Sequence, residues 1–140
     1  MEERSTSMWH PKRWVLAVIL ICAAAAVAGG CRGAALGELA SSNQVRLSQI
    51  SLGMSKEDVI ATMGKQSAET HDGVVHNPWI VEMFADKDGT AYEILYYVTR
   101  KNRPFRAVDK RLATPVILKD GKVVGWGDAL LQRITDSKGR

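Results

Sequence analysis

Ile50-Ser-Leu-Gly-Met-Ser-Lys-Glu-Asp-Val-Ile-Ala-Thr-Met-Gly64 holds the strongest local signals in this chain. Ser55 is a residue type that caps helix N-termini, and Glu57 and Asp58 add negative charge to the first turn, where the helix dipole favours it. Gly64 closes the segment, because glycine adopts the left-handed conformation that ends many helices. The apolar residues between these ends share one stripe: Val59, Ile60 and Met63. The segment therefore predicts a short helix with both ends marked.

The residues just before this helix predict a joint to an earlier one. Leu47 and Ile50 are three residues apart, a spacing that predicts a short helix over 43–50. Gly53 permits a tight turn after that helix, and Met54 supplies an apolar side chain that fills the joint. We therefore expect two short helices that meet at Gly53-Met54-Ser55.

After Gly64 the hydrophobic pattern changes to a period of two residues, which is typical of strands. Trp79–Ala85 reads as a strand, 86–89 as an Asp-Lys-Asp-Gly turn, and Thr90–Thr99 as the partner strand. One face of the second strand is predicted to lie against the helices: Tyr92, Ile94, Tyr96 and Val98.

Three further elements follow from local signals. An Asp-Gly turn predicts a hairpin over Pro115–Trp126, and a second Asp-Gly predicts a short hairpin over Gln66–His76. Asp128–Ile134 predicts a last helix with these residues inward: Leu130, Leu131 and Ile134. The connections are too short for crossovers, so the strands are antiparallel. We predict an α+β fold of two layers, with two short N-terminal helices on an antiparallel sheet of three to four strands and a short C-terminal helix.

The N-terminus carries a secretory pattern. Lys12-Arg13 precedes the apolar run Val15–Val27, and Gly29-Gly30 leads directly to Cys31. Basic residues, an apolar core of roughly 7–15 residues and small residues at a cleavage point are typical of a signal peptide. A cysteine at that point resembles the bacterial lipobox, in which the peptide is cut between Gly30 and Cys31 and the cysteine is lipidated, with palmitate among the acyl groups. We therefore expect a lipoprotein signal peptide over 1–30.

Two other interpretations of this segment stay open. The apolar run is shorter than the roughly 20 residues that span a bilayer, so an uncleaved anchor is one alternative and ordinary cleavage is the other. Glu2 and Glu3 are unusual in a basic leader, so translation from Met8 is also open.

Cleavage before Cys31 leaves one small domain. Residues 31–42 are small and polar with little periodicity, so we predict a flexible tether there, ahead of a domain over 43–140. Cys22 leaves with the signal and Cys31 is lipidated, so no disulfide is expected.

Basic residues gather in one loop of this mildly basic chain, whose formal net charge is +4. They are Arg100, Lys101, Arg103, Arg106, Lys110 and Arg111, with only Asp109 opposing them. One interpretation is a solvated loop. The other is a contact for anionic lipid headgroups or an acidic partner, in which each basic side chain contributes about 1 kcal/mol near an anionic surface. The candidate contact residues are Arg100, Lys101, Arg103 and Arg106. Nucleic acid is not an expected partner of an exported protein.

Residues 50–64 resemble the SmpA/OmlA family, the BamE-like outer-membrane lipoproteins. The family shows an apolar residue, Gly-Met-Ser/Thr, an acidic residue, Val, and a Leu/Met-Gly pair, which here are the motif residues Gly53, Met54, Ser55 and Gly64. The resemblance implies a lipobox, a tether, two helices and a three-stranded antiparallel sheet. Gln66 stands where the family usually has Pro, and the long basic loop and Gly125-Trp126-Gly127 are further differences. The chain therefore resembles a divergent branch of that family.

Catalytic motifs are missing from the sequence. His71, Asp72 and His76 lack the three or four convergent ligands of a metal site and are expected to be turn residues. No nucleophile elbow, phosphate loop or His-Glu-x-x-His motif occurs. We predict a protein that is not an enzyme and has neither metal nor cofactor.

The resemblance implies a role as a non-catalytic accessory in outer-membrane protein assembly or envelope integrity. The expected partners are the membrane, through the lipid, and barrel-assembly components. Arg32 follows the cysteine in place of the Asp that retains lipoproteins in the inner membrane, so we expect the outer membrane, facing the periplasm, with the inner membrane as the alternative. The alternative function is a periplasmic binding or inhibitor module on the same scaffold.

Overall fold

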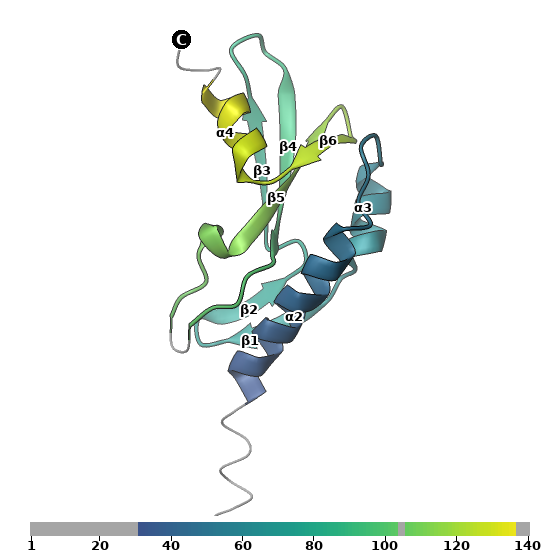
Figure 1. Ribbon diagram of the computed structural model, residues 1–140. Coiled ribbons are helices and arrows are strands. Elements are labelled where there is room, and N and C mark those ends of the chain that lie inside the picture. The colour runs from purple at the N-terminus through teal and green to yellow at the C-terminus, as the bar shows by residue number, and fades with distance from the viewer. Residues whose placement is uncertain (1–30, 104–105, 137–140) are drawn as a thin grey trace, which may run out of the picture. The chain divides into compact units, whose positions relative to one another are not determined.

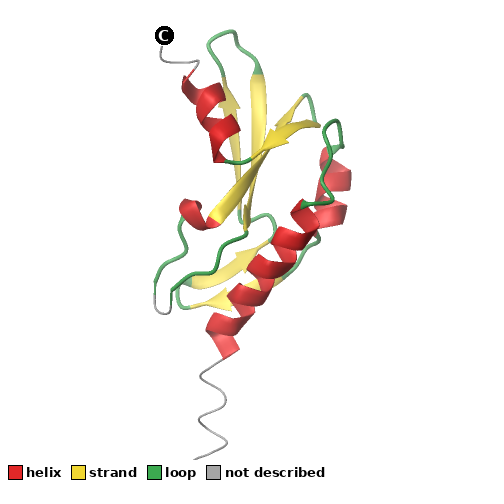
Figure 2. Cartoon of the chain, viewed as in Figure 1, coloured by secondary structure: helices red, strands yellow, loops and turns green. Residues whose placement is uncertain are grey.

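The computed structural model describes residues 31–103 and 106–136, with side chains from residue 35 onward (Figures 1 and 2). The helices within these residues are α2 (Cys31–Leu47), α3 (Lys56–Met63), the 3-10 helix η1 (Lys110–Leu112) and α4 (Asp128–Asp136). The strands are β1 (Ser67–Thr70), β2 (Gly73–His76), β3 (Ile80–Ala85), β4 (Ala91–Val98), β5 (Ala113–Lys119) and β6 (Lys122–Trp126). The described residues from Arg32 onward form one compact unit.

The strands form two antiparallel sheets. One has the order β3-β4-β5-β6, so that each strand pairs with its neighbour in sequence, and the other is the β1-β2 hairpin. The predicted α+β class is confirmed, and so is the short hairpin within Gln66–His76. β3 and β6 are the two edges of the larger sheet.

The first helix is longer than the sequence predicts. α2 runs over 17 residues from Cys31, so the tether predicted over 31–42 is wrong, and the helix ends at Leu47. The reason is an apolar stripe with helical spacing that small neighbouring residues obscure. Its buried members are Leu36, Leu39 and Ala40, and the polar Asn43 is buried one turn further along. This stripe packs against the β1-β2 hairpin and the end of β4, in a base cluster that includes Ala68, Val75 and Val98.

Both ends of α3 are held as its sequence suggests. The Ser55 hydroxyl oxygen accepts a hydrogen bond from the backbone N–H of Asp58 at 3.2 Å. Gly64 has a φ of 72°, and a Cβ there would lie 2.2 Å from Nη1 of Arg46. That guanidinium donates to the Met63 carbonyl at 2.9 Å. Arg46 of α2 therefore occupies the space left by Gly64 and satisfies a carbonyl at the end of α3.

Helices cover both faces of the larger sheet. On one face, Ile50 together with Val59 and Met63 of α3 packs on Leu95, Tyr97, Val116, Leu118 and Val123, which we call the α3-face core. On the other face, α4 packs Leu130, Leu131 and Ile134 beside Ile94, Tyr96 and Ile117. The stripe predicted for the last helix is confirmed. Gly125 lies beneath it, because a Cβ there would lie 2.3 Å from Cδ2 of Leu130.

The prediction for the faces of β4 is confirmed only for Val98, which packs in one cluster with Leu36 and Leu39 of α2. Tyr92, Ile94 and Tyr96 lie beside α4, whereas Leu95 and Tyr97 face α3. β4 is buried on both faces over most of its length, so its alternation cannot tell which set meets the N-terminal helices.

A buried pair of amides ties the N-terminal half to the sheet. Asn43 of α2 and Asn77 exchange two side-chain hydrogen bonds, at 2.9 and 2.6 Å. Asn43 also donates to the Val98 carbonyl at 2.8 Å, and Asn77 donates to the Met63 carbonyl at 3.3 Å. The Asn77–Pro78 peptide bond is cis. α2, the end of α3 and the end of β4 therefore share one polar network.

The joint between the helices closes one edge of the sheet. We call Gly53–Lys56 the joint segment. Its backbone bonds to β6 are Gly53 N–H to the Val123 carbonyl (2.8 Å), Val123 N–H to the Met54 carbonyl (2.9 Å) and Lys56 N–H to the Gly121 carbonyl (3.0 Å). The predicted motif residues Gly53, Met54 and Ser55 thus act as a short strand beside β6, a role that their helix-joint pattern did not predict.

Candidate functional site

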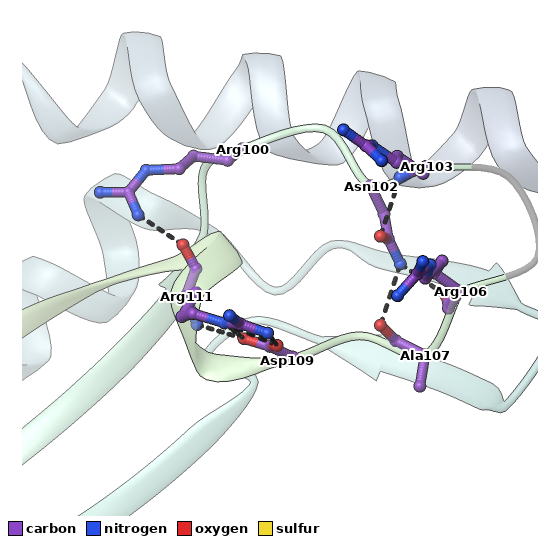
Figure 3. A network of polar contacts seen from close by, with 7 residues as sticks. All are labelled: Arg100, Asn102, Arg103, Arg106, Ala107, Asp109 and Arg111. Carbon is purple, nitrogen blue, oxygen red and sulfur yellow. Dashed lines mark hydrogen bonds and ion pairs between the residues drawn. The ribbon is translucent and has the colours of Figure 1, made fainter.

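The basic loop, residues 100–111, connects β4 to η1, and its residues 104 and 105 lie outside the described part of the chain. Its base is closed by backbone bonds, because the N–H groups of Thr99 and Arg100 both donate to the Leu112 carbonyl at 2.9 Å. The Arg100 guanidinium donates a hydrogen bond to the Arg111 carbonyl (Figure 3). It also forms an ion pair with Asp128 at 3.3 Å. Arg100 therefore secures the base of the loop.

Asn102 bridges the two arms of the loop. Its amide nitrogen donates to the carbonyls of Arg106 and Ala107, at 2.6 and 3.1 Å (Figure 3). Its amide oxygen accepts from the backbone N–H of Arg103 at 2.8 Å. Asparagine often replaces backbone partners in this way within loops. This role of Asn102 was not predicted, because its only signal in the sequence is an asparagine inside a basic run.

Acidic partners neutralise the second end of the loop. Asp109 caps η1 by accepting from the Arg111 N–H at 2.7 Å, and its carboxylate pairs with the Arg111 guanidinium at 2.6 Å. Hydrogen bonding to Arg111 lowers the pKa of Asp109, and the same interaction raises the pKa of Arg111. Both groups are therefore charged at neutral pH, and their charges neutralise each other.

Lys110 is engaged with the edge strand β3. Its ammonium pairs with the Glu82 carboxylate and lies 5.0 Å from the centre of the Tyr96 ring. The hydrogen bond from Lys110 lowers the pKa of Glu82. Burial and the hydrogen bond to Glu82 raise the pKa of Tyr96 to about 12.

Three cations of the loop have no side-chain partner among the described residues. Lys101, Arg103 and Arg106 are exposed, and their side chains form no ion pair or hydrogen bond with the described residues. Of the four predicted contact residues, Arg100 is thus committed to the fold, whereas these three are available. We call Lys101, Arg103 and Arg106 the free cations.

The end of the loop and the first turns of α2 contribute to the same hydrophobic cluster. Val108 and Leu112 belong to the base cluster together with Ala35 and Leu36. Figure 1 shows the loop and the start of α2 at the same end of the described domain. The free cations and the start of α2 therefore lie at one end, which we call the basic end.

The predicted lipidation site is at the start of this helix. Cys31 is the first residue of α2. Its side chain, Gly30 and the predicted signal peptide lie outside the part that the structure describes. No helix among the described residues is both long and apolar enough to cross a bilayer.

The described residues hold no group of three metal ligands. His71 Nδ1 lies 3.0 Å from a carboxylate oxygen of Asp72 in the exposed β1-β2 turn, and His76 is exposed on β2. A shallow hollow of about 630 Å³ lies between the outer faces of α2 and α3 and is lined by Ser42, Val45, Arg46, Gln49, Ala61 and Thr62. Arg46 there is already bonded to the end of α3.

Comparison with known families assigns the chain to one family. Neither the search of curated proteins nor that of solved structures returns a match. The family described as protein of unknown function (DUF3192) matches residues 36–133, from the first half of α2 to α4 and therefore most of the chain. The chain belongs to the DUF3192 family.

Proposed function

We propose that this chain is a lipid-anchored protein of the bacterial envelope, attached through Cys31 and acting as a non-catalytic accessory in outer-membrane protein assembly or envelope integrity. Its free cations bind anionic lipid headgroups. The lipobox-like sequence before Cys31 supports the anchor, and the resemblance of residues 50–64 to the SmpA/OmlA family supports the assembly role.

The observation that carries this proposal is the arrangement of the basic end. α2 is a continuous helix from Cys31, and Val108 of the basic loop packs against the same hydrophobic cluster as Ala35 and Leu36 of its first turns. A lipid on Cys31 brings that end of the domain to the membrane, so the free cations face the headgroups. Three such side chains contribute on the order of 3 kcal/mol near an anionic surface.

Lipid and cations have different tasks in this proposal. The lipid chains supply most of the membrane affinity, because each buried methylene contributes about 0.8 kcal/mol. The cations set the orientation of the domain. The loop is suited to this because Asn102 and Arg100 fix its base and arms through hydrogen bonds, so its charges are held at one place.

The anchor is tested by radiolabelled palmitate in cells that make the wild type or Cys31→Ser. We expect label in the wild type alone, together with loss of the variant from the membrane fraction. Cys22→Ser serves as the matched control and should keep both label and location. Equal labelling of Cys31→Ser would remove the anchor from the proposal.

The headgroup contact is tested with Cys31→Ser protein, which lacks the lipid, on phosphatidylcholine vesicles with and without phosphatidylglycerol. The added binding to the anionic vesicles isolates the charge effect. We expect K101Q/R103Q/R106Q to lose about tenfold or more of that added binding. K65Q/K87Q/K119Q makes the same change in net charge at exposed positions elsewhere and should lose much less. An equal loss in both triple variants would show that net charge, and not the basic end, is responsible.

The assembly role is tested by copurification from mild-detergent extracts. An assembly accessory brings down barrel-assembly components. Recovery of an unrelated enzyme or receptor in their place would favour the binding or inhibitor module.

A further inference from the structure

The β3 edge of the larger sheet is open. β3 pairs only with β4. The Asp86 N–H donates to the Thr90 carbonyl at 3.0 Å, so Asp86 and Thr90 form a hydrogen-bonded pair. Because such pairs alternate along an antiparallel ladder, Phe84 with Tyr92 is also a hydrogen-bonded pair, and Val81 and Met83 belong to the pairs between. The backbone groups of Val81 and Met83 therefore point away from β4. No described segment lies along them as the joint segment lies along β6.

The side chains at this edge are apolar and exposed. Val81 is 50 % exposed and Met83 is 72 % exposed. Val81 continues a row across the sheet whose next members, Leu95 and Val116, are fully buried in the α3-face core. The core packing of the N-terminal helices thus covers β4 to β6 and leaves β3 uncovered.

The usual protections of an edge strand are missing from β3. Natural edges often carry lysine, proline or a bulge, and β3 has the sequence Ile-Val-Glu-Met-Phe-Ala with an unbroken register to β4. Its one charge, Glu82, is paired with Lys110 on the opposite face. Glu93, beside Met83, is paired with Lys56 at 2.5 Å. The edge is therefore close to electrically neutral and complementary to a neutral strand.

We propose that the β3 edge binds an extended segment of another protein, which adds to the sheet as a fifth strand. The backbone groups of Val81 and Met83 pair with the segment, and apolar side chains at every second position of the segment cover these two residues. The proposal names the partner surface of the accessory role proposed above, and the choice between occupants rests on that proposed function.

A second copy of the chain fits this edge less well. An antiparallel β3–β3 pair has a two-fold axis perpendicular to the sheet, which reverses the strand direction in the second copy. α2 starts at the end of the sheet opposite the β3–β4 turn (Figure 1). The two copies would therefore point their basic ends in opposite directions, and one membrane could not hold both lipids.

The test uses the full-length protein in mild detergent and a peptide library with apolar residues at every second position. A library of the same composition in scrambled order is the comparison. We expect the alternating library to yield binders whose addition slows hydrogen exchange at the Val81 and Met83 amides. Their affinity should fall about tenfold or more for Met83→Pro, which removes an outward donor, and for Met83→Lys, which places a charge on the edge.

Val74→Lys is the matched control, because Val74 is 52 % exposed on β2 and the change also replaces an exposed apolar side chain with lysine. It should bind the selected peptides as the wild type does. Circular dichroism and thermal unfolding establish that each variant is folded. Binders that tolerate both Met83 changes, or no preference for the alternating library, would overturn the proposal. Wild-type dimers that Met83→Pro dissociates would assign the edge to a second copy and also overturn it. None of these readouts requires a lipid on Cys31, so this proposal and the anchor fail separately.

Discussion

The two edges of the larger sheet differ in what completes them. At β6, the joint segment supplies three backbone hydrogen bonds, to the Val123 carbonyl, the Val123 N–H and the Gly121 carbonyl. At β3, the outward groups of Val81 and Met83 have no such neighbour among the described residues. The same sheet therefore carries one edge built into its own fold and one edge available to another chain. Proline placed at equivalent outward N–H groups should therefore lower the free energy of unfolding at β6 and change it little at β3.

The largest effect is expected for Val123→Pro. The change removes the bond from Val123 N–H to the Met54 carbonyl and leaves that carbonyl without its partner, so we expect a loss of about 3 kcal/mol in the free energy of unfolding relative to Val123→Ala. Urea unfolding measures it, and the alanine variant removes the side-chain contribution. A difference below about 0.5 kcal/mol would mean that the joint segment does not close the β6 edge.

Asn43→Ala comes next, because it releases the helices that hold the joint segment. Asn77 and the Val98 carbonyl would lose buried partners, at an expected cost of about 2 kcal/mol. Gln44→Ala, at an exposed position of the same helix, is the control and should change the urea midpoint little. Faster hydrogen exchange at Val123 in Asn43→Ala alone would link the amide pair to the closed edge, and equal exchange in both variants would contradict that link.

Tyr97→Phe is expected to stabilise the protein. The Tyr97 hydroxyl is buried in the α3-face core without a hydrogen-bond partner among the described residues, so its removal should add about 1 kcal/mol at neutral pH. Burial raises its pKa to about 12 from an ordinary value of 10.0. Between these values the folded state keeps a proton that the unfolded state has lost, and wild-type stability falls by about 1.4 kcal/mol per pH unit from this group.

Tyr97→Phe lacks that contribution, so its advantage should grow as the pH rises from 10 towards 12. Urea unfolding at several pH values measures the difference. Tyr92→Phe, at a partly exposed position, is the control. An advantage that stays constant with pH would contradict the raised pKa of Tyr97.

The smallest effect is expected for Met83→Pro. Its N–H points away from β4 and its side chain is 72 % exposed, so the free energy of unfolding should change by less than about 0.5 kcal/mol relative to Met83→Ala. Thermal and urea unfolding check this. A loss as large as that of Val123→Pro would show that the β3 edge is already paired.

The features that the sequence predicted correctly are local ones. Asp-Gly turns identified the hairpins, Ser55 and Gly64 identified the ends of α3, and the stripe of α4 lies within one helix. The missed features join distant residues. Asn43 and Asn77 are 34 positions apart, and nothing near either residue indicates its partner.

Two other misses have a physical explanation. The early start of α2 was not predicted because its apolar stripe is buried by the β1-β2 hairpin. The position of that hairpin depends on the whole fold and cannot be read from the residues near the stripe. In the basic loop, charge alone cannot separate Arg100, which holds the loop base, from the free cations. That distinction depends on Asp128 and on the Arg111 carbonyl, which the fold brings to Arg100.

The helical start of the domain also limits how far the sheet can lie from the residue that carries the proposed lipid. α2 has 17 residues and is about 25 Å long at about 1.5 Å per residue, whereas an extended tether of a dozen residues would span up to about 40 Å and swing freely. With the proposed lipid on Cys31, the sheet is confined to a narrow layer just above the bilayer. A partner strand must enter that layer to be captured, so the helix selects proteins that are themselves close to the membrane.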